Sequence, residues 1–175
     1  MSTTRGIDLE HLGLRDALDL AVLIEEEARE RYAEFVEQME MHHTPEAAAF
    51  FRVMAGSEEK HRAELWRRRR ELFPVEAVAV TRSMLFDVEA PDYDEARAFM
   101  TERQALESAL RAERKAHDFF AAAIPRLSDP LVRALFQELR SEELLHQELV
   151  RRRLDALPPD PPFAASDFAD EPVAQ

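Results

Sequence analysis

The sequence predicts an all-α fold, a four-helix bundle made of two helical hairpins joined by a long crossover. Three observations predict it. Only three of the 175 residues are glycine, and long stretches consist of Ala, Leu, Glu and Arg, which lose little on entering a helix. Apolar residues recur every three or four positions within these stretches. The prolines lie between the stretches or near the C-terminus, where they would end helices.

The four helices are expected, in order, at about 15–42, 45–73, 94–124 and 129–157. Their expected caps are Thr44, Thr101 and Ser128. The first and second helices, and the third and fourth, are separated by short connections, so each pair should form an antiparallel hairpin. Residues 74–93 are long enough to run beside a helix of about 25 residues, roughly 38 Å. This segment is expected to carry the chain from one end of the bundle to the other.

The length of the chain favours one domain rather than two. We expect an N-terminal extension at 1–13 and the bundle at 14–157. Residues 158–175 are rich in proline and acidic residues and have no helical period, which predicts a disordered tail. The alternative for this tail is a docking peptide that uses Phe163 and Phe168.

Composition argues against several classes of function. The formal net charge is −13, whereas nucleic acid and anionic membrane surfaces bind clustered positive charge. The sequence contains no cysteine, which removes disulfides, zinc ribbons, iron-sulfur clusters and thiol catalysis. The first residues form no signal-peptide apolar region, and no run is long enough for a membrane span. We therefore expect a cytoplasmic protein with neither nucleic acid nor membrane as partner.

The chain contains an internal repeat. The segment 17–32 matches 105–120 at three alanines, one leucine and one glutamate. The second and fourth expected helices echo each other as FRVMAGSEEKH and FQELRSEELLH. The second hairpin therefore looks like a copy of the first.

Each expected helix carries one glutamate near the middle of an otherwise apolar face, and the second and fourth add a histidine three residues later. These residues are Glu25, Glu58, His61, Glu113, Glu143 and His146. Four buried carboxylates would lose hydration and repel one another unless cations lay between them. One Glu from each of two helices and Glu-x-x-His from each of the other two is the pattern of di-iron and di-manganese bundles. Carboxylate and imidazole ligands together suit iron or manganese.

Other polar residues have simpler interpretations. Glu40-x-x-His43 has the same spacing but lies off the apolar face, so we interpret it as a chance copy. Tyr32 is expected in the core, with a hydrogen bond to a ligand or electron transfer as the alternative. The arginines at 67–70 and 151–153 should close their helices, facing water and offsetting the helix dipole.

The segments IEEEARERY, SEEKH, LRAERKAHDFF and RSEELLH, in that order, resemble the rubrerythrin group of the ferritin-like superfamily. The resemblance covers about residues 14–157. It implies that Glu58 and Glu143 bridge two irons, and that the other ligands are divided between the two sites, Glu25 with His61 and Glu113 with His146. Rubrerythrins typically carry a further glutamate one turn after the third-helix ligand, where this chain has Ala116. The family's redox-linked ligand exchange at one iron therefore does not carry over.

The resemblance implies a non-haem di-iron oxidoreductase that reduces hydrogen peroxide or dioxygen. Alternatives are a ferroxidase for iron storage or delivery, a di-manganese catalase-type protein and a metal-free interaction bundle. The expected partners are a second copy of the chain, with a dimer favoured, and an external electron donor such as a rubredoxin-type or flavin protein. Because the sequence has no cysteines to hold a rubredoxin iron, electrons for any turnover would come from a separate protein or from ferrous iron itself.

Overall fold

Four long helices make up most of the computed structural model, which describes residues 8–78, 80–82 and 101–158. The helices are α1 (Leu14–Met41), α2 (Pro45–Leu72), α3 (Glu102–Ala123) and α4 (Pro130–Ala156), with short 3-10 turns η1 (Leu9–His11) and η3 (Ile124–Arg126). No strand occurs among these described residues. The all-α, ferritin-like four-helix prediction is therefore confirmed.

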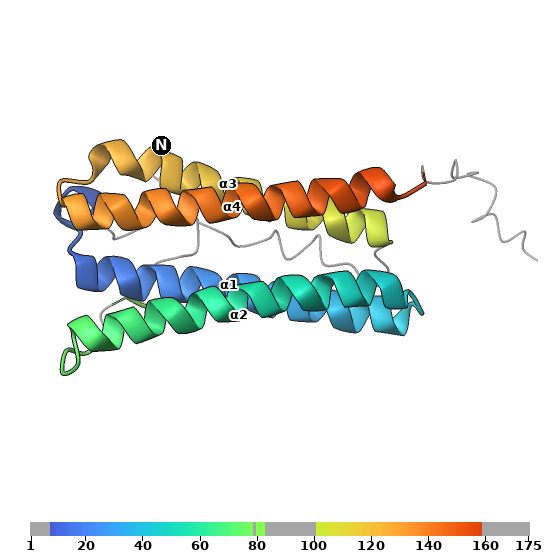
Figure 1. Ribbon diagram of the computed structural model, residues 1–175, viewed down its shortest axis with the longest axis horizontal. Helices are drawn as coiled ribbons and strands as arrows, with labels where there is room; N and C mark the ends of the chain where they lie inside the picture. Colours follow the sequence, from blue (N-terminus) through green and yellow to red (C-terminus); the bar gives the residue numbers. More distant parts are fainter. Residues whose placement is uncertain (1–7, 79, 83–100, 159–175) are drawn as a thin grey trace, which may run out of the picture.

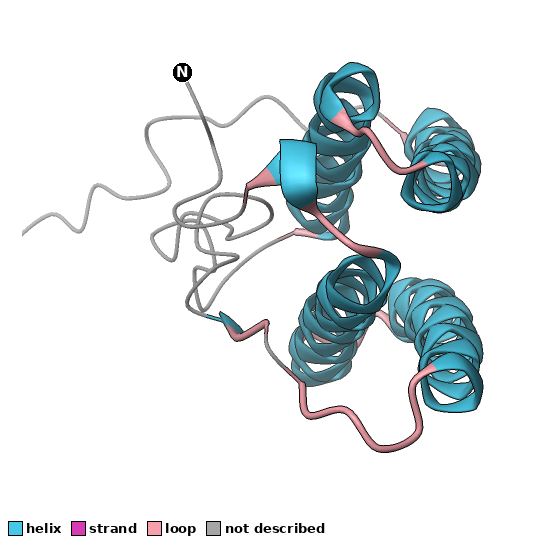
Figure 2. Ribbon diagram, turned by 90° about the vertical axis from the view of Figure 1, so that its left-hand side faces the viewer, coloured by secondary structure: helices cyan, strands magenta, loops and turns pink. Residues whose placement is uncertain are grey.

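The helices pair into two antiparallel hairpins. Figure 1 shows α1 beside α2 in the lower pair and α3 beside α4 in the upper pair. Seen end-on in Figure 2, the two pairs stack on each other. The residues at 42–44 join the first pair, and η3 with the residues at 127–129 joins the second. Both predicted hairpins are thus present.

The start of α3 differs from the prediction, which placed it near residue 94. Thr101 has extended backbone angles, φ −70° and ψ 162°. Its hydroxyl accepts a hydrogen bond from the Gln104 amide, and the Gln104 side chain accepts one from the Thr101 amide, at 3.2 and 3.0 Å. This reciprocal capping box satisfies two free amides at the helix start. Thr101 is the cap that the sequence predicted, but α3 begins directly after it.

The cap of α4 is Asp129 rather than the predicted Ser128. The Asp129 carboxylate accepts a hydrogen bond from the Leu131 amide at 2.7 Å. Ser128 instead donates to the carbonyl of Glu10 at 2.6 Å. Ser128 therefore helps to hold η1 against the bundle.

The predicted N-terminal extension is partly built into the core. Leu9 and Leu12 are 3% and 7% exposed and join the apolar cluster at their end of the bundle. The predicted tail, apart from Pro158, lies outside the described residues. None of the described helices has an apolar stretch of the kind that crosses a bilayer.

Two apolar clusters fill the bundle on either side of its middle. The first contains Leu18, Ala21, Ile24, Phe120, Phe136 and Leu139, among others. The second contains Tyr32, Phe35, Met39, Phe51, Leu106 and Val150, among others. Except for Ile24, the residues named here were predicted from helical spacing. The polar residues discussed below lie between these clusters, where both ends of the bundle shield them from water.

The described part of the crossover runs along α1. Arg82 forms a paired contact with the Glu30 carboxylate at 2.8 and 2.9 Å and lies 3.1 Å from Glu26. Val80, just before it, is 7% exposed. The chain thus leaves the end of α2 and returns along α1, the direction that the predicted crossover requires. Residues 83–93 of that segment lie outside the described residues.

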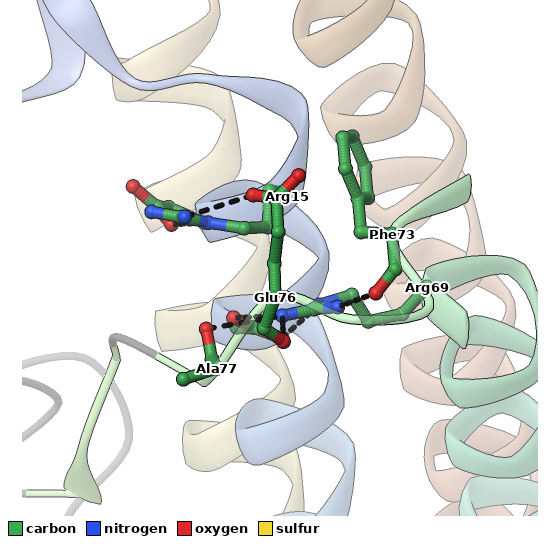
Figure 3. Close-up of polar contacts among 7 residues, drawn as sticks. Arg15, Arg69, Phe73, Glu76 and Ala77 are labelled. Atoms are coloured by element: carbon green, nitrogen blue, oxygen red, sulfur yellow. Dashed lines mark hydrogen bonds and ion pairs between the residues drawn. The ribbon is translucent and has the colours of Figure 1, made fainter. Parts of the chain in front are cut away.

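One of the arginines that close α2 does not face water as expected. The side chain of Arg69 is 3% exposed and that of Asp19, on α1, is 0% exposed. Arg69 donates to the Asp19 carboxylate at 2.6 and 3.3 Å. It also donates to the carbonyls of Phe73, Glu76 and Ala77 at 2.6, 3.0 and 3.3 Å (Figure 3). Arg69 therefore fixes the turn after α2 to the first helix, a role that helical spacing did not reveal.

Candidate metal centre

The predicted site residues come together at the middle of the bundle, one glutamate from each helix. The four glutamates and one histidine are buried, with exposed fractions of 2–6%: Glu25, Glu58, Glu113, Glu143 and His146. The side chain of the second histidine, His61, is 25% exposed. The cluster thus has one edge that reaches solvent.

His146 lies between carboxylates from two other helices. Its Nδ1 atom is 3.0 Å from Glu58 Oε1 on α2 and 3.5 Å from Glu113 Oε2 on α3. On its other side, its Nε2 atom is 3.4 Å from the Ser57 hydroxyl. The Nδ1 atom therefore faces the carboxylates, and Nε2 faces the bundle's polar edge.

His61 occupies the matching place on the other side. Its Nδ1 atom is 3.7 Å from Glu25 Oε2 and 3.9 Å from Glu58 Oε2. The two imidazole rings of His61 and His146 stack, with centroids 5.4 Å apart and planes at 12°. Glu58 thus presents one oxygen toward each histidine.

Side-chain donors of the cluster fall into three groups, each with its ligand atoms within 4.8 Å of one another. The groups are Glu58 with His61 and His146, Glu25 with His61 and Glu142, and Glu113 with Glu143 and His146. Oxygen and imidazole nitrogen at this spacing match what iron or manganese binds. The first group shares His61 with the second and His146 with the third, so Glu58 belongs to a group that lies between the other two.

The unsatisfied polar atoms of the cluster test whether a cation fits. Within the described part of the chain, Glu58 Oε1, His61 Nδ1 and His146 Nδ1 are buried and form no hydrogen bond of acceptable geometry. An unpaired buried acceptor costs roughly 1–3 kcal/mol, and more when it is charged. A cation between them would satisfy all three atoms, so the donor set fits a metal.

The pKa values of these groups follow from their burial. Burial, with the Glu58 charge nearby, raises the pKa of Glu25 to about 8. Burial also raises the pKa of Glu58. Burial thus disfavours the ionised form of both carboxylates unless a positive charge is near.

The groups around His146 and Glu113 shift the pKa values of these two residues in the direction opposite to the effect of burial. Burial by itself lowers the pKa of His146, but the carboxylates of Glu113 and Glu58 outweigh it and raise the pKa to about 11. Burial likewise opposes ionisation of Glu113, but contacts with His146, Glu143 and Tyr32 hold its pKa below the ordinary value. Without metal, His146 thus supplies the positive charge of this half of the cluster.

Tyr32 reaches the cluster from α1. Its side chain is fully buried, and its hydroxyl donates a hydrogen bond to Glu113 Oε1. The Gln147 side chain donates to the backbone carbonyl of Glu113 at 3.3 Å. The alternative that Tyr32 bonds a candidate ligand therefore agrees with the geometry. Carboxylates that bind metals are commonly held by such outer contacts.

Glu142 belongs to the cluster although sequence reasoning missed it. Its Oε2 atom is 4.0 Å from His61 Nδ1, and its side chain is 30% exposed. It lies beside Glu143 but off the apolar face, which is why helical spacing did not select it. The sequence signal that could have found Glu142 was the internal repeat. It aligns Glu142 with Ser57, since each directly precedes the glutamate of a Glu-x-x-His segment.

The Glu40-x-x-His43 copy lies apart from this cluster. Both residues are exposed at the turn between α1 and α2, where Glu40 pairs with Arg52 at 2.5 Å. His43 has a positive φ of 57°, a left-handed conformation that turns use. His43 is part of the connection between α1 and α2 and lies outside the three donor groups.

Comparison with known proteins identifies the family and the fold of the chain. An uncharacterised conserved protein from Magnetospirillum magnetotacticum MS-1 has a solved structure that matches with a TM-score of 0.73 and 27% identity, over 87% of this chain and 100% of that one. A hypothetical protein from Pyrococcus furiosus matches with a TM-score of 0.57 and 21% identity, over 86% and 95% of the two chains, which shows the fold alone. No curated protein gives a significant match. The sequence profile described as rubrerythrin matches residues 16–154, and the chain therefore belongs to the rubrerythrin family.

Proposed function

We propose that this protein is a di-iron oxidoreductase that reduces hydrogen peroxide or dioxygen. The observation that carries the proposal is the set of unsatisfied donor atoms at the bundle's centre, on Glu58, His61 and His146. They face the carboxylates of Glu25 and Glu113, within 3.7 and 3.5 Å of a histidine nitrogen. A metal-free interaction bundle would have no reason to keep these groups there, since apolar residues would stabilise it more.

The residues that would hold two irons are the six predicted ones. Glu25 and His61 would hold one ion, Glu113 and His146 the other, and Glu58 and Glu143 would bridge them. A reduced iron pair supplies two electrons, which with two protons convert one hydrogen peroxide to two water molecules.

The chain's own residues would prepare and shield this reaction. The apolar clusters on either side exclude water along the bundle axis. Tyr32 holds the Glu113 carboxylate through its hydroxyl, which fixes one ligand before a cation arrives. The oxidant and protons would enter at the part-exposed edge beside His61. The site is thus buried on most sides and open on one.

Anaerobic loading followed by peroxide tests the proposal. Protein loaded with two equivalents of Fe²⁺ should consume about one peroxide per chain, followed by stopped-flow absorbance and residual peroxide. Glu113→Gln should lose this reaction. His43→Asn, which changes the off-site motif and suits the positive φ there, should retain it. A loaded, reduced protein that reacts with neither peroxide nor dioxygen would contradict the proposal.

The open edge also favours a second candidate, in which Fe²⁺ is a substrate that enters beside His61 and is oxidised and passed on. This ferroxidase would oxidise many more than two Fe²⁺ per chain under air. The oxidoreductase would stop at two without an added reductant. We further propose that the protein is a homodimer supplied by an external electron donor. Size-exclusion mass and turnover with a reduced rubredoxin-type or flavin protein are the corresponding measurements.

A further inference from the structure

The internal repeat relates the two Glu-x-x-His segments of the cluster, but the residues that precede their glutamates differ. Aligning FRVMAGSEEKH with FQELRSEELLH places Glu58 with Glu143 and His61 with His146. The residue just before each glutamate differs: Ser57 precedes Glu58 on α2, and Glu142 precedes Glu143 on α4. Each lies beside the histidine of the other helix. One half of the cluster therefore has an additional carboxylate.

Ser57 and Glu142 lie next to different ring nitrogens of their neighbouring histidines. Ser57 lies against Nε2 of His146, on the side away from the nitrogen that faces Glu58 and Glu113. Glu142 lies 4.0 Å from Nδ1 of His61. Glu25 and Glu58 face that same nitrogen. The position of Ser57 suits a residue that orients a ligand, whereas Glu142 shares the ligand side of its histidine.

We propose that Glu142 is a further metal ligand, binding the ion held by Glu25 and His61, an inference that rests on the proposed function. Three ligand atoms from these residues lie within 4.8 Å of one another. Glu58, whose side chain is 3% exposed, points Oε2 toward His61 Nδ1 at 3.9 Å, and that nitrogen is buried and forms no hydrogen bond of acceptable geometry. The position one turn after Glu113, on α3, offers only the fully buried methyl group of Ala116.

The proposal makes the two ions unequal. The ion beside Glu25 gains a third terminal side chain from α4, and the ion beside Glu113 does not. Because Glu142 is 30% exposed, this ligand lies at the solvent edge of the site. The competing interpretation is that Glu142 is a surface acid that pairs with His61 only while His61 is protonated and no metal is bound.

Titration of the metal-free protein with Co²⁺ distinguishes these interpretations. Calorimetry gives the number of ions and the affinity of each, and the visible absorption of Co²⁺ reports its coordination. Glu142→Gln removes the charge with little change of shape. The matched control is Glu138→Gln, one turn earlier on α4, where the side chain is 58% exposed and lies 3.5 Å from Arg68. Circular dichroism verifies that both variants keep their helices.

We expect Glu142→Gln to lower the affinity for one of the two Co²⁺ ions by about 10- to 100-fold and to change the absorption spectrum of that ion. Glu138→Gln should leave both ions unchanged. Equal affinities and spectra in Glu142→Gln and wild type would overturn the proposal, as would equal weakening in both variants, because that would mark a general effect of charge. If wild-type protein binds no pair of ions at all, the proposed function itself fails, and this result is distinct from the other two.

Discussion

The hydroxyl of Tyr32 on α1 donates a hydrogen bond to the carboxylate of Glu113 on α3, and so joins one hairpin to the ligand set of the other. Both residues are at most 2% exposed. The contact therefore lies where water does not compete with it, and where loss of one partner leaves the other unsatisfied.

Tyr32→Phe removes this hydrogen bond and leaves the ring in place. We expect the metal-free variant to lose about 1–3 kcal/mol of unfolding free energy, because a buried carboxylate oxygen loses its donor. Urea unfolding measures this loss. A double-mutant cycle with Glu113→Gln isolates the pairwise part. A coupling energy of zero would show that the two residues are energetically independent.

Metal-free protein should lose stability as the pH rises from about 4.5 to 8. Glu25 has a pKa of about 8 when folded, against an ordinary value of 4.5. In that window the folded state keeps a proton that the unfolded state has released, so unfolding free energy falls by up to about 1.4 kcal/mol per pH unit. The His146 pKa, raised from 6.5 to about 11, adds a change of the same sign above pH 6.5.

Urea unfolding at several pH values, with a chelator present, measures this dependence. Glu25→Gln should reduce the slope of this dependence below pH 6.5, and Glu58, whose pKa is also raised, should account for part of what remains. Bound metal should reverse the trend, because cations compete with protons for the same atoms and bind better as the pH rises. A metal-free protein that becomes more stable between pH 6.5 and 8 would contradict the burial argument.

Glu143-x-x-His146 on α4 and Glu40-x-x-His43 at the connection between α1 and α2 have the same spacing but should differ in metal binding. His146→Ala should remove at least one of two ions from the titrated protein, since His146 Nδ1 faces two carboxylates. His43→Asn should keep both, since His43 is exposed and lies outside the cluster. Elemental analysis after gel filtration counts the ions. Loss of an ion in His43→Asn would show that the motif off the apolar face also binds metal.

The Arg69–Asp19 pair should contribute to stability without touching the candidate metal centre. Arg69→Met leaves the Asp19 carboxylate buried and unpaired, which costs about 3–5 kcal/mol. It also frees the backbone carbonyls after α2 (Figure 3). Replacing both residues, with Asp19→Leu added, should restore part of the loss, measured by chemical denaturation. If Arg69→Met unfolds at the wild-type midpoint, the pair is not a stabilising contact.

The sequence predicted the helices well where local signals were strong. Prolines at 45 and 130 mark the first residues of α2 and α4, because proline suits the first turn of a helix and breaks later ones. The start of α3 was placed near residue 94, too early, because no proline lies directly before Glu102 to mark it. There Thr101 and Gln104 decide the boundary through a pair of hydrogen bonds, and a threonine alone does not identify such a pair.

The sequence by itself determined which face of each helix is apolar and which glutamate interrupts it, because side chains three and four residues apart share one side of a helix. It did not determine which groups from different helices meet. Tertiary structure decided that Tyr32 bonds Glu113, that Arg69 pairs with Asp19 across 50 positions of sequence, and that Glu142 lies beside His61. Helical spacing determines the direction in which each side chain points from the axis of its own helix. The contacts between helices depend on the relative position and rotation of separate helices, which the packing of the whole core determines.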